Sequence, residues 1–490
     1  MTVMAPPLTG ALSSQAEWNS IDWAQIAKTV KRLQRRIAKA ATDQKWGKVK
    51  SLQWLLTHSR SAKLLAVKKV TSNRGKNTAG VDGIVWLTNE QKLTGVETLN
   101  RRGYQPKPLR RIYIPKSNGS KRPLGIPSIK DRAYQALHLL ALEPVSETGA
   151  DPNVYGFRPY RSTADAVAQC FNVLSRKSSA KWVLEGDIKS CFDEIDHDWL
   201  RKSIPMDTQV LNKWLRCGYL DKGILFHTRA GTPQGGVISP TLMVMTLQGL
   251  EQCVKAVCKR SDKVHVVVYA DDFVVTASSK EVLTDKVRPA IEHFLKTRGL
   301  RLSQEKTSIT HIDKGFDFLG FNFRKYKEKL LIKPAKSNCL KFLRILAQEL
   351  KRLRAESAEI VIRVLNPKIR GWANYYRHVV SSQIFSTIAH RLFWMTWRWA
   401  RRRHPNKSAA WVKRKYYANL GNNNWVFFGR NYSKQLTLYL FSPTTVSIKR
   451  HVKIKSEANP YDAAFAAYYS NRRQQRFSSP SPSVIEKVLV

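Results

Sequence analysis

The chain has 490 residues, of which 43% are hydrophobic and 10% aromatic, so it can form packed cores and is not an intrinsically disordered protein. Lys and Arg number 84 against 36 Asp and Glu, and the resulting formal charge of +48 is spread along the chain, which indicates nucleic acid as a partner. An anionic membrane is the alternative, but no apolar run approaches the roughly 18 residues of a spanning helix and no lipidation signal is visible.

The cysteines and the N-terminus indicate a reducing compartment. The six cysteines form no CxxC pair, so we expect neither a zinc site nor a disulfide framework. The first residues, MTVMAPPLTGALSSQAEW, lack the basic start and apolar core of a secretory signal. We therefore expect an intracellular, cytoplasmic protein, associated with the nucleoid when it engages DNA.

Basic helices are predicted at the start of the chain. Apolar residues recur at spacings of three and four from Trp23 to Ile37, and the other face of this helix is basic and includes Arg32 and Arg36. A second segment with the same character begins at Trp46. A solvated charged face would explain one such helix, but two in succession favour a surface that faces a polyanion. We expect residues 1–95 to form a helical, basic N-terminal extension.

A β-hairpin is predicted next, in RRIYIPKSNGSKRPLGIP. The segment reads as a strand, an Asn-Gly turn and a second strand, and it carries Lys116, Lys121 and Arg122. Helical patterns follow, the second of them opened by YGFRPYRSTADAV. The glycine-rich loop GTPQGGVISP, at 231–240, then runs into an apolar helix.

Two apolar strands end in carboxylates. The strand in KWVLEGDIKSCF ends at Asp187, and VVVYADDFVVTA is predicted to be a hairpin with Asp271 and Asp272 at its tip. An acidic turn of no special function is one interpretation. If the strands lie side by side, however, the three carboxylates meet at one edge of a sheet and suit two Mg²⁺ ions. Two such ions can activate a hydroxyl and stabilise a leaving pyrophosphate.

The last third of the chain is predicted to be helical and basic. Leucines from Leu340 to Leu353 share one stripe, with Arg344 and Lys351 elsewhere on the surface. Residues 391–415 hold nine Lys or Arg, five large aromatic residues and no acid. Aromatic rings can stack on unpaired bases while cations follow phosphates, although the tryptophans can equally fill a helical core. We expect the tryptophans to lie mostly in the core and the arginines to contact RNA.

These motifs, in their order along the chain, resemble a known family. YADD at 269–272, Asp187 with Phe192 five residues later, and GTPQGGVISP resemble the palm and fingers of reverse transcriptases. YIPKSNGSKRPLGIP, YGFRPYRST and GWANYYRHV are similar to the proteins encoded by group II introns, which act as reverse transcriptase and splicing maturase. The resemblance spans about residues 20 to 470.

The resemblance implies a right-hand polymerase of the α/β (α+β) class. Fingers and a palm with an antiparallel sheet would occupy residues 96–330, and the helical thumb and maturase helices 331–400. A basic, α-rich region that binds RNA or DNA would follow at 401–475, and a flexible tail at 476–490.

The resemblance also implies roles for residues in the polymerase site. Asp187 and Asp271 would bind the two Mg²⁺ ions with support from Asp272, and Lys306 would protonate the departing pyrophosphate, although a surface lysine is as good an account of it. The implied nucleotide-binding residues are Lys116, Arg122, Phe192, Gln234, Gly235 and Tyr269. Within this set the two cations would grip the triphosphate and the phenylalanine would select against a 2′-hydroxyl. Core packing is the competing interpretation of both aromatic residues.

The resemblance also implies partners: the intron RNA in a ribonucleoprotein, an RNA template with a DNA primer, target DNA and dNTPs. The protein would support splicing of the intron and its mobility (retrohoming) by target-primed DNA synthesis. The residues we expect to contact RNA are Arg32, Arg36, Arg344, Lys351, Arg370, Arg377, Arg401, Arg402, Arg403 and Lys413.

One departure from the family and two rival functions remain. Many relatives carry a cysteine-rich HNH endonuclease domain, and this sequence has no cysteine after Cys339, so mobility would need a primer from another source. The rivals are a splicing factor with a relic polymerase site and a domesticated reverse transcriptase without an intron partner. The intact carboxylates argue against the first, and the maturase-like sequence beyond residue 365 argues against the second.

Overall fold

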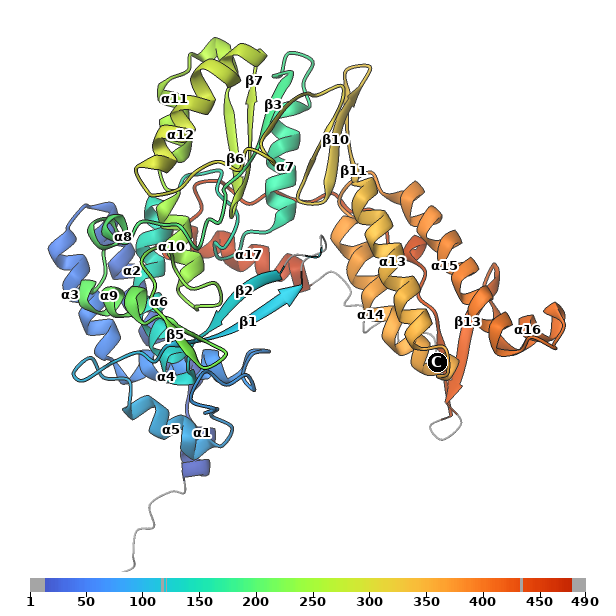
Figure 1. Ribbon diagram of the computed structural model, residues 1–490, viewed down its shortest axis with the longest axis horizontal. Helices are drawn as coiled ribbons and strands as arrows, with labels where there is room; N and C mark the ends of the chain where they lie inside the picture. Colours follow the sequence, from blue (N-terminus) through green and yellow to red (C-terminus); the bar gives the residue numbers. More distant parts are fainter. Residues whose placement is uncertain (1–13, 116–118, 120, 432–434, 478–490) are drawn as a thin grey trace, which may run out of the picture.

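The computed structural model describes residues 14–115, 119, 121–431 and 435–477 of the chain. Figure 1 shows a large body, built from the first two thirds of the chain, and a helical lobe set to one side of it. In the terms of the expected architecture, we call the parts of the body the N-terminal helices, fingers and palm, and we call the lobe the thumb. The α/β right-hand architecture expected from the sequence is therefore confirmed. Within the described part of the chain, no helix is both long enough and apolar enough to cross a membrane.

The described part of the chain begins with five helices, three of which pack against the later helix α6 (Ile129–Gly149). They are α1 (Ser14–Ser20), α2 (Trp23–Thr42), α3 (Trp46–His58), α4 (Arg60–Thr71) and α5 (Asn89–Glu97). The α2 helix starts where the Asp22 carboxylate accepts hydrogen bonds from two backbone N–H groups, which satisfies donors that a helix start leaves free. Its apolar stripe, including Val30 and Ile37, is buried, and the predicted amphipathic helix is confirmed.

The fingers contain a four-stranded sheet in the order β2-β1-β4-β5. The predicted hairpin is confirmed, because β1 pairs antiparallel with β2 from Arg110↔Ile126 to Pro115↔Lys121. The elements of the fingers and the adjoining helices are β1 (Leu109–Pro115), β2 (Lys121–Ile126), α6 (Ile129–Gly149), α8 (His197–Ser203), α9 (Thr208–Arg216), β4 (Tyr219–Asp221), β5 (Ile224–Phe226), α10 (Ser239–Thr246) and α11 (Leu250–Ala256).

The palm is a second four-stranded sheet, in the order β6-β7-β3-β8. The sequences of its central strands are nearly continuous apolar runs, because helices cover the sheet. Val183, Val267 and Val274 are accordingly fully buried. The palm elements are α7 (Thr163–Leu174), β3 (Trp182–Asp187), η1 (Arg260–Asp262), β6 (His265–Tyr269), β7 (Asp272–Ala277), the π-helical turn η2 (Val282–Val287), α12 (Arg288–Lys296) and β8 (Ser308–His311).

A small sheet, β11-β10-β9, follows the palm and leads into the thumb. The thumb helices enclose a separate hydrophobic core that includes Leu346, Ile362, Ile388 and Trp399. In addition to the expected helices, this region contains a three-stranded sheet, β12-β13-β14. The elements are β9 (Phe316–Phe318), β10 (Phe321–Tyr326), β11 (Lys329–Pro334), α13 (Lys336–Arg352), α14 (Ala358–Tyr376), α15 (Ser382–Arg403), α16 (Ala409–Tyr416), β12 (Tyr417–Leu420), β13 (Asn423–Asn431) and β14 (Leu436–Tyr439).

After the thumb the chain returns to the palm through η3 (Pro443–Thr445), η4 (Ala463–Phe465) and α17 (Ala466–Phe477). The Asp165 carboxylate accepts hydrogen bonds from the backbone N–H of Ile454, at 2.8 Å, and from Nε2 of His451, at 2.7 Å. Tyr461 reaches Glu143 on α6. This return was not expected from the sequence, and it ties residues 446–477 to the body rather than leaving them as an independent terminal region.

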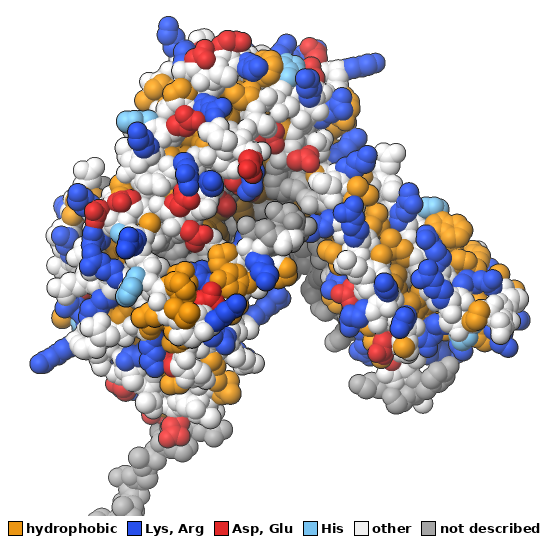
Figure 2. Space-filling model, viewed as in Figure 1, with side chains coloured by type: hydrophobic (Ala, Val, Ile, Leu, Met, Phe, Trp, Pro, Cys, Tyr) orange, Lys and Arg blue, Asp and Glu red, His pale blue; other side chains and the backbone are white. Residues whose placement is uncertain are grey.

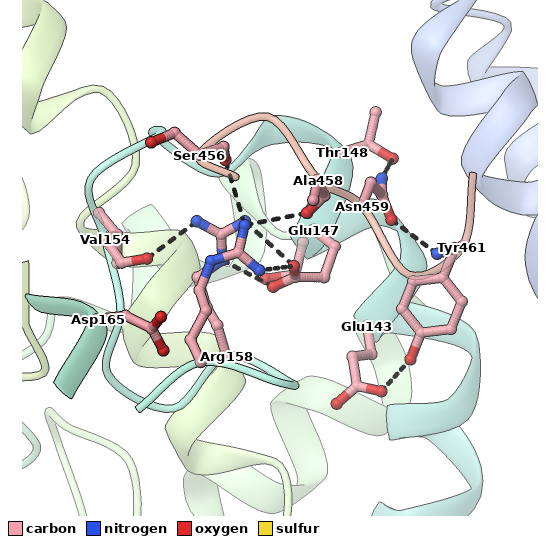
Figure 3. Close-up of polar contacts among 12 residues, drawn as sticks. Glu143, Glu147, Thr148, Val154, Arg158, Asp165, Ser456, Ala458, Asn459 and Tyr461 are labelled. Atoms are coloured by element: carbon pink, nitrogen blue, oxygen red, sulfur yellow. Dashed lines mark hydrogen bonds and ion pairs between the residues drawn. The ribbon is translucent and has the colours of Figure 1, made fainter. Parts of the chain in front are cut away.

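Two arginines of the YGFRPYRST motif anchor this return (Figure 3). The buried Glu147 carboxylate is shared by Arg158, whose Nε lies 2.8 Å from Oε1, and by Arg161, whose Nη1 lies 3.2 Å from Oε2. Arg161 also donates hydrogen bonds to the backbone oxygens of Ser456 and Ala458. The motif therefore carries buried charges that are paired and hydrogen-bonded, as buried charges must be.

Candidate active site

The acidic pair lies in a tight hairpin turn between β6 and β7. Tyr269 pairs with Asp272, so only Ala270 and Asp271 form the turn, and Ala270 adopts a φ of 59°. In the neighbouring strand Asp187 lies directly opposite Asp272. The predicted meeting of three carboxylates at one edge of the palm sheet is confirmed at the level of strand register.

The carboxylates of this edge repel one another. The pKa of Asp272 is raised to about 7, first by partial loss of hydration and then by the negative charges of Asp271 and Asp187, although part of the residue remains exposed. Loss of hydration also raises the pKa of Asp271, and the nearby charges of Arg122 and Lys306 partly oppose that shift. Such a cluster favours any cation that can enter it.

A lysine occupies the cation position beside Asp187. The Lys306 Nζ lies 3.0 Å from Oδ1 and 2.9 Å from Oδ2 of Asp187. This hydrogen bond raises the pKa of Lys306, which stays protonated at neutral pH. Lys306 therefore lies beside the acidic edge, and its ammonium group stands where a metal ion would compete for the same oxygens. Its expected role as proton donor to the departing pyrophosphate stays a prediction.

The donor set suits Mg²⁺, which prefers carboxylate oxygens together with phosphate and water. In their present rotamers, however, no three His, Cys, Asp or Glu side chains among the described residues converge as ligands of one ion. Asp187, Asp271 and Asp272 are the residues that would hold divalent ions here. Their chemistry fits, and Lys306 shows that a cation is accommodated beside Asp187.

A glycine from the YGFRPYRST motif supports the acidic turn, and sequence reasoning gave it no role. The backbone of Asn153 to Tyr155 pairs with Val268 on the outer edge of β6, at 3.0 Å and 2.9 Å. This pairing presses Gly156 against the turn, where a Cβ atom would lie 2.2 Å from the backbone nitrogen of Ala270. The only sequence signal for this contact is a glycine placed between two aromatic residues.

The glycine-rich loop 231–236 joins the fingers to the palm. The backbone N–H of Gly125, on β2, donates to the carbonyl oxygen of Gln234 at 2.8 Å. Gly235 adopts a φ of 113°, and a Cβ atom there would lie 2.7 Å from the Gly125 oxygen. On the palm side, the backbone N–H of Thr232 donates to the Phe192 oxygen at 2.6 Å. The absence of a side chain at Gly235 therefore permits a close backbone approach to β2.

The remaining nucleotide-binding candidates that the structure describes are Phe192, Tyr269 and Arg122. Phe192 is half-buried and makes an edge-to-face contact with Phe157, at 5.9 Å between ring centroids. Tyr269 is also half-buried. Arg122 is exposed on β2, and its positive charge is close enough to Asp271 to oppose part of the rise in the pKa of that carboxyl group. Lys116 lies outside the described residues, and its expected role stays a prediction.

The candidate RNA-binding residues fall on two surfaces. Arg32 and Arg36 are exposed on α2 of the body. The others belong to the thumb lobe, on which Figure 2 shows Lys and Arg side chains interleaved with hydrophobic ones and few acids on the visible face. Exposed members are Arg344, Lys351, Arg401 and Arg402, and half-buried members are Arg370, Arg377, Arg403 and Lys413.

Some of these cations also have partners within the protein. Arg403 donates hydrogen bonds to the backbone oxygens of Arg354 and Glu356, so it closes the α13–α14 turn. Lys413 lies over the ring of Trp425, which is 40% exposed, at 4.4 Å from its centroid. Trp399 is buried, as expected for the tryptophans of this segment, whereas Trp394 is 43% exposed. The segment thus mixes core and surface aromatics.

Comparisons with known proteins agree with this geometry. Residues 114–323 match the family model described as reverse transcriptase (RNA-dependent DNA polymerase), and residues 18–99 match the N-terminal domain of reverse transcriptase. Residues 341–417 match the group II intron, maturase-specific domain, and no HNH domain is matched. The chain belongs to the group II intron-encoded reverse transcriptases. By domain content this reverse transcriptase is an RNA-directed DNA polymerase.

Individual relatives align with parts of this reverse transcriptase. Protein YkfC of Escherichia coli K12 is 33% identical over 59% of this chain and 87% of its own length. The group II intron-encoded protein LtrA of Lactococcus lactis is 29% identical over 53% of this chain, and the match spans only 54% of LtrA. Among solved structures, telomerase from Candida albicans overlaps 64% of this chain and 66% of its own, at 13% identity and a TM-score of 0.38.

Proposed function

We propose that this reverse transcriptase copies RNA into DNA at the acidic turn and that it binds its own intron RNA as a splicing maturase. The observation that carries the first half is the pairing of Asp187 with Asp272 beside Asp271. Three carboxylates at a sheet edge repel one another and are stable together only with cations, and dNTPs and phosphodiesters bring further negative charge that requires the same cations.

In this proposal Asp187, Asp271 and Asp272 hold two Mg²⁺ ions. When bound, these ions would activate the primer 3′-hydroxyl and neutralise charge on the departing pyrophosphate. Lys306 contacts Asp187 and remains protonated, so its amine can donate a proton at this edge. The adjoining strands β3 and β7 and the turn before β7 thus supply the metal ligands, and the loop before β8 supplies the proton donor.

The fingers would position the incoming dNTP. Arg122 presents a guanidinium near Asp271, and Lys116 is its proposed partner on the same hairpin, together forming a cationic fork for the triphosphate. Gln234 and Gly235 would form one wall of the nucleotide pocket, since their backbone joins β2 to the palm. Phe192 would lie beneath the sugar and exclude a 2′-hydroxyl, and Tyr269 would pack near the primer end.

The thumb would hold RNA by charge and stacking. Figure 2 shows the molecule hollowed between the body and the thumb lobe, and a template–primer duplex is the proposed occupant of this hollow. Arg401 and Arg402, with Arg344 and Lys351, would contact phosphates of the intron RNA, and exposed Trp394 and Trp425 would stack on unpaired bases. Because the protein would bind the folded intron RNA more tightly than the unfolded RNA, binding would stabilise the active conformation of the intron. Retrohoming into target DNA is the proposed outcome of combining the two activities.

A paired assay on the same preparations tests the two halves separately. Primer extension on an RNA template and intron splicing at low Mg²⁺ are measured for wild type, for Asp271→Ala and for the double variant Arg401→Ser, Arg402→Ser. We expect Asp271→Ala to abolish extension and preserve splicing, and the double variant to weaken splicing more than extension.

Each rival function predicts another pattern. A splicing factor with a relic polymerase site would support splicing without extension in the wild type. A domesticated reverse transcriptase would extend the primer without any effect on splicing. Either result would overturn the proposal.

A further inference from the structure

A cavity of about 550 Å³ lies on the outer side of the fingers, away from the acidic turn. Its walls come from α3, from α6 and from the segment 201–208 that joins α8 to α9 (Figure 1 places α3, α8 and α9 at one edge of the body). Gln53 fixes this frame, because its Nε2 donates to the backbone oxygens of Ala141, at 3.3 Å, and Pro205, at 2.9 Å. The cavity is therefore held open by rigid elements, as ligand sites usually are.

An exposed aromatic platform forms one side of the cavity. Trp54 is 60% exposed and stacks on His58, with the ring centroids 4.2 Å apart and the planes inclined by 25°. A hydrogen bond of 2.8 Å from Nδ1 of His58 to the Trp54 oxygen holds the histidine ring in place. Trp46, about two helical turns earlier on α3 and also in the cavity wall, is 47% exposed. Large exposed aromatic surface in a rigid cavity indicates a binding site.

The charge of the cavity wall is positive. Its one carboxylate, on Asp207, is bound by Arg101 at 2.5 Å, so it offers little free negative charge. Arg201 is paired with Asp198 outside the cavity. Lys50 and Lys202 are exposed, and no described residue forms an ion pair with either of them. The two free ammonium groups therefore favour an anionic ligand.

The inner wall carries a polar atom without a partner. His138 on α6 is 7% exposed, and its Nε2 has no hydrogen-bond partner among the described residues. Its ring is fixed by edge contacts with Tyr134 and Trp214, at centroid distances of 4.9 Å and 5.4 Å. Burial lowers the pKa of His138 to about 4, so the ring is neutral at physiological pH and can donate or accept a hydrogen bond. Buried polar atoms usually have partners, so this atom also indicates a ligand.

We propose that this cavity binds one unpaired nucleotide of an RNA strand, with the base on Trp54 and the adjoining phosphates on Lys50 and Lys202. Aromatic platforms beside free cations are how proteins hold single-stranded RNA, and the excess positive charge of this protein makes a strand a better occupant than an isolated neutral molecule. The cavity is separate from the polymerase site, because none of Asp187, Asp271 and Asp272 lines it.

Photocrosslinking tests this site without primer or dNTPs. The full chain is crosslinked to a single-stranded RNA of about 12 nucleotides that contains 4-thiouridine. Two matched pairs of variants on the same helix isolate the cavity. Trp54→Ala is compared with Leu55→Ala, which removes an exposed side chain outside the cavity wall. Lys50→Ser is compared with Lys48→Ser, which removes the same charge from a neighbouring exposed position.

We expect crosslinks on peptides that contain 46–58 or 201–208. Their yield should fall fivefold or more in Trp54→Ala, because stacking of one base is worth about 1 kcal/mol or more. The yield should also fall in Lys50→Ser, because that variant loses a contact with phosphate. Leu55→Ala and Lys48→Ser should crosslink as wild type does, and primer extension should be unchanged in Trp54→Ala. The absence of crosslinks to these peptides would overturn the proposal, and so would equal losses in both members of each pair. Loss of the crosslink with normal extension separates this site from the polymerase site.

Discussion

Gly156 lies directly against Ala270, the residue at the tip of the acidic turn. A Cβ atom at Gly156 would lie 2.2 Å from the Ala270 nitrogen and 2.8 Å from the Tyr269 carbonyl carbon. The loop that carries Gly156 is fixed in turn by the buried Arg158 and Glu147 ion pair. The position of the YADD turn therefore depends on a segment more than a hundred residues earlier in the chain.

Gly156→Ala should displace the turn. The new methyl group meets backbone atoms, which cannot move aside as a flexible side chain would, so the carboxylates should shift relative to one another. We expect primer extension to fall by about 100-fold, since misplacement of about 1 Å costs that much, while RNA binding stays near wild type. Gly47→Ala is the control, because nothing lies within 4 Å of a Cβ atom at that position. An equal loss of primer extension in both variants would contradict the proposed role of Gly156.

Lys306→Ala should strengthen metal binding while weakening catalysis. The Lys306 ammonium bonds both carboxylate oxygens of Asp187, so its removal frees them for a divalent ion. Because this lysine is largely exposed and its ion pair is screened by solvent, we expect Mn²⁺ affinity of the free protein to rise only about two- to fivefold. Electron paramagnetic resonance titration measures this affinity. Lys306→Arg keeps the positive charge and should bind Mn²⁺ as wild type does.

Glu147→Gln should destabilise the protein strongly. Glu147 is buried between Arg158 and Arg161, and its loss of charge leaves two buried guanidinium groups without a counterion. We expect the free energy of unfolding to fall by about 3–5 kcal/mol, measured by denaturant titration. Glu328→Gln breaks the exposed pair with Lys177 and should leave the free energy of unfolding close to that of wild type, because solvent screens the pair. Similar losses in the two variants would show that Glu147 does not anchor the returning C-terminal segment.

The neutral His138 should make stability depend on pH. Its pKa is about 4 in the folded protein and near 6.5 when unfolded, so below pH 6.5 the unfolded chain binds the proton and folding is weakened. This contribution is fully present above pH 6.5 and is lost as the pH falls toward 4. Between pH 7.5 and 5, wild type should lose on the order of 2 kcal/mol more than His138→Gln. Parallel pH profiles of the two proteins would contradict this assignment.

Local sequence patterns were sufficient to predict the acidic turn of the candidate site. The valine runs before Ala270 and after Asp272 specify two half-buried or buried strands, and the short polar connection between them leaves only a hairpin turn. The approach of Asp187 needed one further assumption, that its strand is a neighbour, and the register confirms it. Short continuous apolar runs on either side of a polar turn therefore place the carboxylates.

Long-range contacts made by single polar residues were not predictable. Asp165 and His451 are 286 residues apart in the chain, and neither stands in a periodic pattern that would indicate its partner. The same holds for Gly156, whose role follows from a missing Cβ atom rather than from any repeated feature. Arg403 was expected on RNA, and its bonds to the α13–α14 turn could not be inferred from a run of three arginines.

The most direct test of the central claim is a metal-specificity switch at Asp271. Asp271→Cys replaces a hard carboxylate with a thiolate, which prefers softer ions to Mg²⁺. Primer extension is measured in Mg²⁺ and in Mn²⁺, with Asp285→Cys as the control on an exposed helix turn of the palm. We predict that Asp271→Cys is inactive in Mg²⁺ and partly recovers in Mn²⁺, while the control is active in both. Full activity of Asp271→Cys in Mg²⁺ would contradict a metal-binding role for the YADD turn.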